Sequence, residues 1–121
     1  MSQAPNSKPY HLDDRTYEFA KRVRAFVRSL PRTVANVEDA WQLVRASGSV
    51  GANYIEANEC LGKKDFLLRI RISRKEAKEG RYWLRLLDTK GRKELEAERE
   101  ALTQEAGELV KIFSRIVQKT E

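Results

Sequence analysis

Residues 64–89 read KDFLLRIRISRKEAKEGRYWLRLLDT, and this stretch decides the fold. Within it, apolar or small side chains recur every three to four residues, close to the repeat of packed helices. The repeating positions are Phe66, Ile70, Ser73, Ala77, Gly80, Leu84 and Leu87. Small residues occupy the middle of this face, so a second helix can approach closely at mid-length. We therefore expect one long helix over 64–89 that packs tightly against a neighbour.

Small residues also gather in the preceding segment, where residues 46–52 read ASGSVGA. A loop is one interpretation. A phosphate-binding loop is not favoured, because no Gly-Lys-Ser/Thr follows and no strand precedes. Helical spacing continues through the stretch along Val37, Trp41, Val44, Gly48, Gly51 and Ile55. This pattern favours a close-packed helix that Asn36 caps and that ends at a turn over 61–63. In the simplest geometry, the thin patches of the two helices face each other.

Two further amphipathic segments flank this pair. The first is capped by Asp13 or Asp14 and ends at Pro31, because a proline disfavours helical backbone in the residue before it. Its apolar stripe consists of Phe19, Val23, Phe26, Val27 and Leu30. The last segment runs from Arg92 to Lys119 and follows Gly91, a candidate C′ residue. Its stripe consists of Leu95, Leu102, Ala106, Leu109, Phe113 and Ile116.

Four amphipathic helices joined by short turns predict an all-α, antiparallel up-down four-helix bundle. The bundle domain is expected over residues 13–121, and residues 1–12, with two prolines and small polar side chains, are expected to form a disordered tail. A chain of 121 residues fits one domain that needs no disulfide to support its core.

The composition excludes several kinds of site. His11 is the only histidine and Cys60 the only cysteine, so Cys/His zinc sites and a disulfide framework are ruled out. We expect Cys60 to be a thiol without chemistry and His11 to be inert. No apolar run approaches the roughly 20 residues that span a bilayer, and the N-terminus lacks an apolar signal core. We therefore expect a cytoplasmic protein that does not bind membranes.

The charge is concentrated in one part of the chain. Residues 63–93 carry 12 Lys/Arg and 4 Asp/Glu, whereas residues 94–121 carry 4 and 7. Such a basic segment is a possible footprint for nucleic acid or another polyanion. The alternative is that the basic segment is neutralised by the acidic segment beside it.

The basic side chains of the helix over 64–89 are the candidate nucleic-acid-binding residues. We assign this role to Arg69, Arg71, Lys75, Lys78 and Arg85. Tyr82 and Trp83 lie among them, and cations interleaved with aromatic rings suit phosphate contact with base stacking. The same mixture suits a protein interface, and a plain solvated face is a third interpretation. Arg74 and Arg81 are expected to pair with nearby glutamates instead.

Carboxylates at helical spacing raise the possibility of a metal site. Glu56 pairs with Glu59 and Glu76 with Glu79, each three residues apart, as in carboxylate-bridged metal sites of helix bundles. No histidine stands near either pair, so we favour ion pairs with Arg45, Arg74 or Arg81 and expect no cofactor. Asn53 and Glu56 either fix the packing register or belong to a small-ligand site.

Two motifs resemble a known family. Residues 42–57, with Asn53 and Glu56, look like its Ser-x-x-x-Asn-Ile-x-Glu signature, although Tyr54 and Asn58 depart from the pattern of many members. Residues 71–87 resemble its Lys-Glu-Ala-x-Glu-x-x-Tyr-Trp-Leu segment. The motif residues are Asn53, Glu56, Glu76, Glu79, Gly80 and Trp83. The family comprises the four-helix-bundle proteins called intervening-sequence or S23 proteins, some of them encoded within bacterial 23S ribosomal RNA genes.

The resemblance implies a four-helix bundle that assembles as a ring-shaped homopentamer. It also implies similarity to the accessory variability determinant of diversity-generating retroelements, a basic pentameric barrel that binds nucleic acid and a reverse transcriptase. The leading hypothesis is a non-enzymatic oligomer that binds RNA or DNA. The alternative is a homo-oligomeric scaffold or protein-interaction module without nucleic acid, and an enzyme or metalloprotein ranks third.

Overall fold

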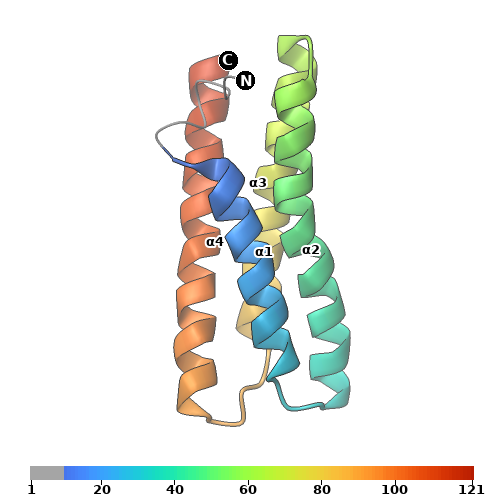
Figure 1. Ribbon diagram of the computed structural model, residues 1–121, viewed down its shortest axis with the longest axis vertical. Helices are drawn as coiled ribbons and strands as arrows, with labels where there is room; N and C mark the ends of the chain where they lie inside the picture. The colour runs from blue at the N-terminus through green and yellow to red at the C-terminus, as the bar shows by residue number, and fades with distance from the viewer. Residues whose placement is uncertain (1–9) are drawn as a thin grey trace.

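The computed structural model describes residues 10–121 and shows four antiparallel helices joined by short turns (Figure 1). They are α1 (Leu12–Arg28), α2 (Val34–Glu59), α3 (Lys63–Leu86) and α4 (Lys93–Thr120). Each helix packs against its neighbours in the order α1, α2, α3 and α4, and α1 also contacts α4. The expected all-α, up-down bundle is confirmed. None of the described helices combines the length and the apolarity that crossing a membrane requires.

The core runs along the bundle axis. Its largest fully buried side chains are Leu12, Phe19, Val23, Leu43, Tyr54, Ile70, Leu84, Leu87, Leu102, Leu109, Phe113 and Ile116. Leu12 opens α1 and is completely buried, and Tyr10 packs against the core. The tail was expected to end at residue 12, but Leu12 belongs to α1 and Tyr10 packs against the core. The bundle therefore begins before the expected boundary. Residues 1–9 of the expected tail lie outside the described residues.

Helix α2 buries a different face from the one that its apolar spacing suggested. The buried positions are Asn36, Ala40, Leu43, Ala46, Ser47, Val50, Tyr54 and Ala57. Trp41 and Ile55, which belong to the expected apolar stripe, are 64% and 61% exposed. The assignment was wrong because the true core face is built largely of small residues, whereas the more apolar stripe lies at the surface.

Residues 46–52 are helical, as expected, and α2 approaches α3 closely at this level. The hydroxyl of Ser73, fully buried on α3, donates a hydrogen bond to the carbonyl oxygen of Val50 at 2.9 Å. The two glycines of α2, however, face α1: a Cβ on Gly51 would lie 3.0 Å from Oγ1 of Thr16, and one on Gly48 3.2 Å from Arg24. The thin patches of α2 and α3 therefore meet only in part, because the glycines of α2 pack against α1.

Asn36 ties two loops together and does not cap α2. The cap is Thr33, whose side chain accepts from the backbone N–H of Asn36 at 3.1 Å. The Asn36 amide donates to the carbonyl oxygens of Pro31 and Asp88 at 2.9 and 2.8 Å, and accepts from the N–H of Asp88 at 2.9 Å. This buried side chain therefore joins the α1–α2 loop to the α3–α4 loop.

The other helix ends differ from expectation by a few residues. His11, in left-handed backbone, precedes α1 without a side-chain cap, and Asp13 and Asp14 lie inside the first turn. There, their negative charge interacts favourably with the positive end of the helix dipole. Helix α3 ends at Leu86, so Gly91 is not its C′ residue. Lys90 and Gly91, with φ of 57° and 72°, instead form the turn before α4.

Asn36→Ala should destabilise the protein by about 2–4 kcal/mol, because Asp88 and Pro31 would lose their hydrogen-bond partner inside the fold. Urea unfolding monitored by circular dichroism measures the change. Asn58→Ala is the control, because Asn58 is exposed near the other end of α2. Equal midpoints for the two variants would show that the loops do not depend on Asn36.

Two glycine-to-alanine changes should have opposite effects. A Cβ at Gly80 would meet Phe19 and Leu43 at 3.9 and 4.0 Å, an ordinary contact distance, so Gly80→Ala should stabilise by up to about 1 kcal/mol. Gly51→Ala should destabilise by about 1 kcal/mol, because buried Thr16 cannot move without shifting α1. Gly80→Leu should cost about 1–3 kcal/mol through overpacking. Thermal unfolding of the three variants tests this order, and destabilisation by Gly80→Ala would contradict it.

Candidate nucleic-acid interface

One basic stripe runs along α3 on the side next to α4. It consists of Arg71, Arg74, Lys78, Arg81 and Arg85, which are three or four residues apart and therefore share one helix face. Two side-chain contacts show that the stripe faces α4. Arg71 pairs with Glu121, and Nη1 of Arg74 lies 3.4 Å from Oγ of Ser114.

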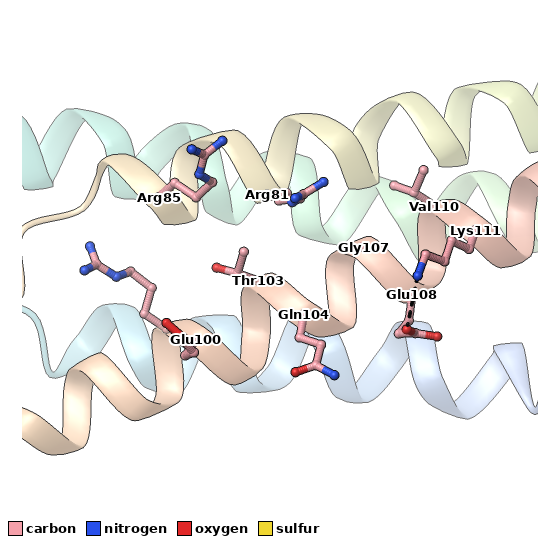
Figure 2. A pocket seen from close by; sticks show the side chains of 10 residues that line it. Arg81, Arg85, Glu100, Thr103, Gln104, Gly107, Glu108, Val110 and Lys111 are labelled. Carbon is pink, nitrogen blue, oxygen red and sulfur yellow. Dashed lines mark ion pairs between the residues drawn. The ribbon is translucent and has the colours of Figure 1, made fainter.

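The stripe borders a groove of about 750 Å³ between α3 and α4 (Figure 2). Arg81 and Arg85 project from α3, and Thr103, Gly107 and Val110 lie along the α4 side. The groove is also lined by Arg99, Glu100, Gln104, Glu108 and Lys111. A Cβ placed on Gly107 would meet nothing within 4 Å, so the α4 side is open at that point. Four cationic and two anionic side chains line the groove, which leaves it net positive.

The cations of the groove differ in how much they are already engaged. Arg99 binds Glu96 at 2.9 Å and the carbonyl of Leu87, and Lys111 lies 3.9 Å from Glu108. Arg81 and Arg85 have no hydrogen bond or ion pair with any residue of the described chain. These two guanidinium groups are exposed and therefore available to a ligand.

The five residues assigned to nucleic acid from the sequence fall into two groups. Lys78 and Arg85 are exposed and have no partner in residues 10–121. The remaining three are engaged: Arg69 donates to Oδ1 of Asn53 at 2.9 Å, Arg71 pairs with Glu121, and Lys75 lies 3.8 Å from Glu79 and 4.0 Å from Glu76.

Arg81 was expected to pair with a glutamate and does not, so it joins Lys78 and Arg85. Its one-turn spacing from Arg85 is the signal that could have identified it. We call Lys78, Arg81 and Arg85 the free cations.

Two carboxylates of α4, Glu98 and Glu105, pair with arginines of α1. Arg15 holds Glu105 with two hydrogen bonds of 2.7 and 3.0 Å, and Arg22 holds Glu98 with two of 3.0 and 3.2 Å. Hydrogen bonding to these carboxylates raises the pKa of both arginines. Glu98 and Glu105 therefore face α1. Glu100 and Glu108 line the groove beside the stripe, and Glu121, which follows α4, pairs with Arg71.

Comparisons with known proteins agree with the observed fold. The sequence profile of the 23S rRNA-intervening sequence protein family matches residues 11–115. The chain belongs to this family. A crystal structure of an S23 ribosomal protein family member of unknown function from Bacteroides thetaiotaomicron has a TM-score of 0.73 and 28% identity. The match covers 88% of this chain and 97% of that one. A search of curated proteins found no match. The family resemblance of the two sequence motifs is confirmed.

In this intervening-sequence family member, the motif residues lie mainly between α2 and α3. Asn53 donates to the carbonyl of Ser49 at 2.9 Å and accepts from Arg69, which links the two helices. Glu56 is exposed and, within the described residues, makes no side-chain ion pair. Gly80 is buried, and Trp83 packs partly against the core. The motif therefore acts chiefly on packing, and neither Arg74 nor Arg81 pairs with a glutamate within residues 10–121.

Tyr54, which departs from the family pattern, is fully buried with its ring 6.2 Å from that of Phe113. Its hydroxyl has no hydrogen-bond partner within residues 10–121. An unsatisfied buried hydroxyl costs about 1–3 kcal/mol. This residue therefore contributes through the packing of its ring and not through a polar network.

The groups considered for metal or thiol chemistry lie apart. No cluster of three or more His, Cys, Asp or Glu residues in the described chain could hold a metal ion. Cys60 is a free, half-buried thiol that donates to the carbonyl of Glu56 at 3.3 Å, and His11 is exposed before α1. Neither faces the α3–α4 groove.

The fold changes the pKa of Glu76, one of the motif residues. Burial raises its pKa above 4.5, and the nearby Glu79 raises it further, against the lowering effects of Lys75 and Arg45. The folded state therefore binds this proton more tightly than the unfolded chain does. Above the raised pKa, the ionised carboxylate lowers stability.

Glu76→Gln should consequently raise the free energy of unfolding at neutral pH. The advantage should shrink as the pH falls and vanish below the ordinary glutamate pKa, where both states of the wild type are protonated. Denaturant unfolding of both proteins across this range measures the difference. Glu59→Gln is the control, since Glu59 is exposed at the end of α2. An advantage for Glu76→Gln that grows in acid would contradict the assignment.

Proposed function

We propose that this protein is a non-enzymatic, oligomeric nucleic-acid-binding protein that contacts the sugar-phosphate backbone through the α3–α4 groove. The observation that carries the proposal is the set of free cations, three side chains along one face of α3 that have no partner within residues 10–121. A row of unpaired cations is electrostatically costly unless solvent or a polyanion neutralises it, and phosphates do so with release of counterions.

Binding through this surface is expected to be independent of base sequence. Phosphate contacts position a protein on nucleic acid, whereas base-edge contacts carry sequence information. The free cations are long, exposed side chains on a regular helix. The family description refers to 23S rRNA and that of the Bacteroides protein to ribosomal proteins, which fits an RNA environment.

Arg81→Gln combined with Arg85→Gln should weaken binding to RNA and DNA by roughly tenfold or more at moderate salt. The slope of log affinity against log salt should fall by about 1–2, because binding releases one counterion fewer for each phosphate that the variant no longer neutralises. Fluorescence anisotropy over a salt series measures both quantities.

Arg28→Gln combined with Arg32→Gln is the matched control, because it removes the same charge from exposed arginines outside the groove. Equal losses in both double variants would show that binding follows net charge and not this groove. No measurable binding by the wild type at low salt would leave the scaffold function below as the proposal.

The second candidate function is a homo-oligomeric scaffold, and the exposed apolar stripe of α2 favours it. Trp41, Val37 and Val44 line a groove of about 430 Å³ beside α1, together with Val27 and Leu30. Leu68 and Leu86 are also exposed on α3. Exposed apolar patches commonly mark interfaces. Because Leu68 and Leu86 lie on another helix than the α2 stripe, a contact between them and the stripe of a second copy is head-to-tail. Such contacts form a ring where the rotation between subunits closes and a filament where it does not.

The two proposals are compatible, because a ring would present the free cations once in each subunit and increase affinity by avidity. Five subunits are proposed from the family resemblance.

Trp41→Glu should dissociate the oligomer, because it places a charge in the apolar contact. Sedimentation velocity over a range of concentrations measures the subunit number. Gln42→Glu, an exposed change on the next residue of α2, should leave assembly intact. A wild-type protein that sediments as a monomer at every concentration would exclude the ring.

A further inference from the structure

The exposed ring of Tyr82 lies among the free cations. It is 56% exposed, four residues after Lys78 and three before Arg85, so all three side chains are neighbours on one helix face. Trp83 packs edge-to-face against it, with ring centroids 5.1 Å apart. Trp83 is itself anchored against the core, so it limits the positions open to the Tyr82 ring. The surface thus combines three cations with one oriented aromatic ring.

This combination distinguishes between paired and unpaired nucleic acid. In a duplex, the bases are stacked on one another and their faces are not available to a side chain. In a single strand, a base can stack on an aromatic ring while neighbouring cations hold the backbone. The cations alone would bind the phosphates of either form, but only an unpaired base can stack on the exposed tyrosine beside them.

The shape of the groove leads to the same distinction. The groove is lined by side chains of two adjacent helices and measures about 750 Å³, which suits one extended backbone and not the width of a double helix. Its α4 side carries Thr103 and Gly107, whose small size leaves room for a phosphate. Arg81 and Arg85 are four residues apart, about 6 Å along the helix axis, so they can contact successive phosphates.

We propose that the α3–α4 groove binds a single strand of RNA or DNA, with its phosphates on Arg81 and Arg85 and an unpaired base on Tyr82. This inference rests on the proposed nucleic-acid function and adds the class of ligand and the stacking residue. A duplex can touch the rim of the groove but gains no stacking contact.

The test compares three fluorescent probes of equal length: an oligouridylate, an oligothymidylate and a DNA duplex. Anisotropy titrations at near-physiological salt give the affinity of the full-length wild type, Tyr82→Ala and Tyr82→Phe. We expect the wild type to bind both single strands at least roughly tenfold more tightly than the duplex. Tyr82→Ala should lower single-strand affinity by roughly 5- to 100-fold and leave duplex affinity unchanged, whereas Tyr82→Phe should retain binding.

The outcomes separate this inference from the proposed function. If single strands and duplex bind equally and Arg81→Gln with Arg85→Gln weakens both, the groove binds nucleic acid but the single-strand inference is overturned. If no probe binds the wild type, both are overturned. If Tyr82→Ala changes the sedimentation coefficient and leaves single-strand affinity intact, Tyr82 belongs to a protein interface and the inference fails.

Discussion

The close contact between α2 and α3 is the constraint on which the rest of the structure depends. Ser73 is fully buried and satisfies its hydroxyl on the carbonyl of Val50, which is possible only where the two backbones lie close together. Ala77 and Gly80 continue the same thin face of α3. Burying this face fixes the rotation of α3 about its axis. Arg81 and Arg85 are thereby turned away from α2 and toward the groove that α3 forms with α4.

The distribution of ion pairs decides which charges remain available. Helix α4 is acidic, but Glu98 and Glu105 are held by the arginines of α1 in two-point contacts. These pairs are only partly buried, so each contributes modestly to stability. Glu100 and Glu108 of α4 also line the groove, so α4 offsets part of the positive charge there and leaves the groove net positive.

The bundle therefore has two surfaces with different chemistry. The α3–α4 side is basic and polar, whereas the α1–α2 side is apolar, with Trp41 beside a hollow lined by aliphatic side chains. A scaffold needs the second surface and a nucleic-acid-binding protein needs the first. The two surfaces lie on different sides of the bundle, one between α3 and α4 and the other beside α1 and α2.

The sequence by itself determined the four helices, their antiparallel order, the basic character of α3 and the family. These follow from local properties, namely apolar periodicity, short turns and residue type. It did not determine that Asn36 binds Asp88, 52 positions away, or that Arg81 lacks a partner while Lys75 has two.

The sequence also predicted the wrong buried face for α2. Small residues on the buried face and apolar residues on the exposed face reduce the difference in hydropathy on which periodicity depends. Only the tertiary structure decided these points. Hydrogen bonds and ion pairs form between side chains that packing brings together, and distance along the chain does not reveal which ones meet.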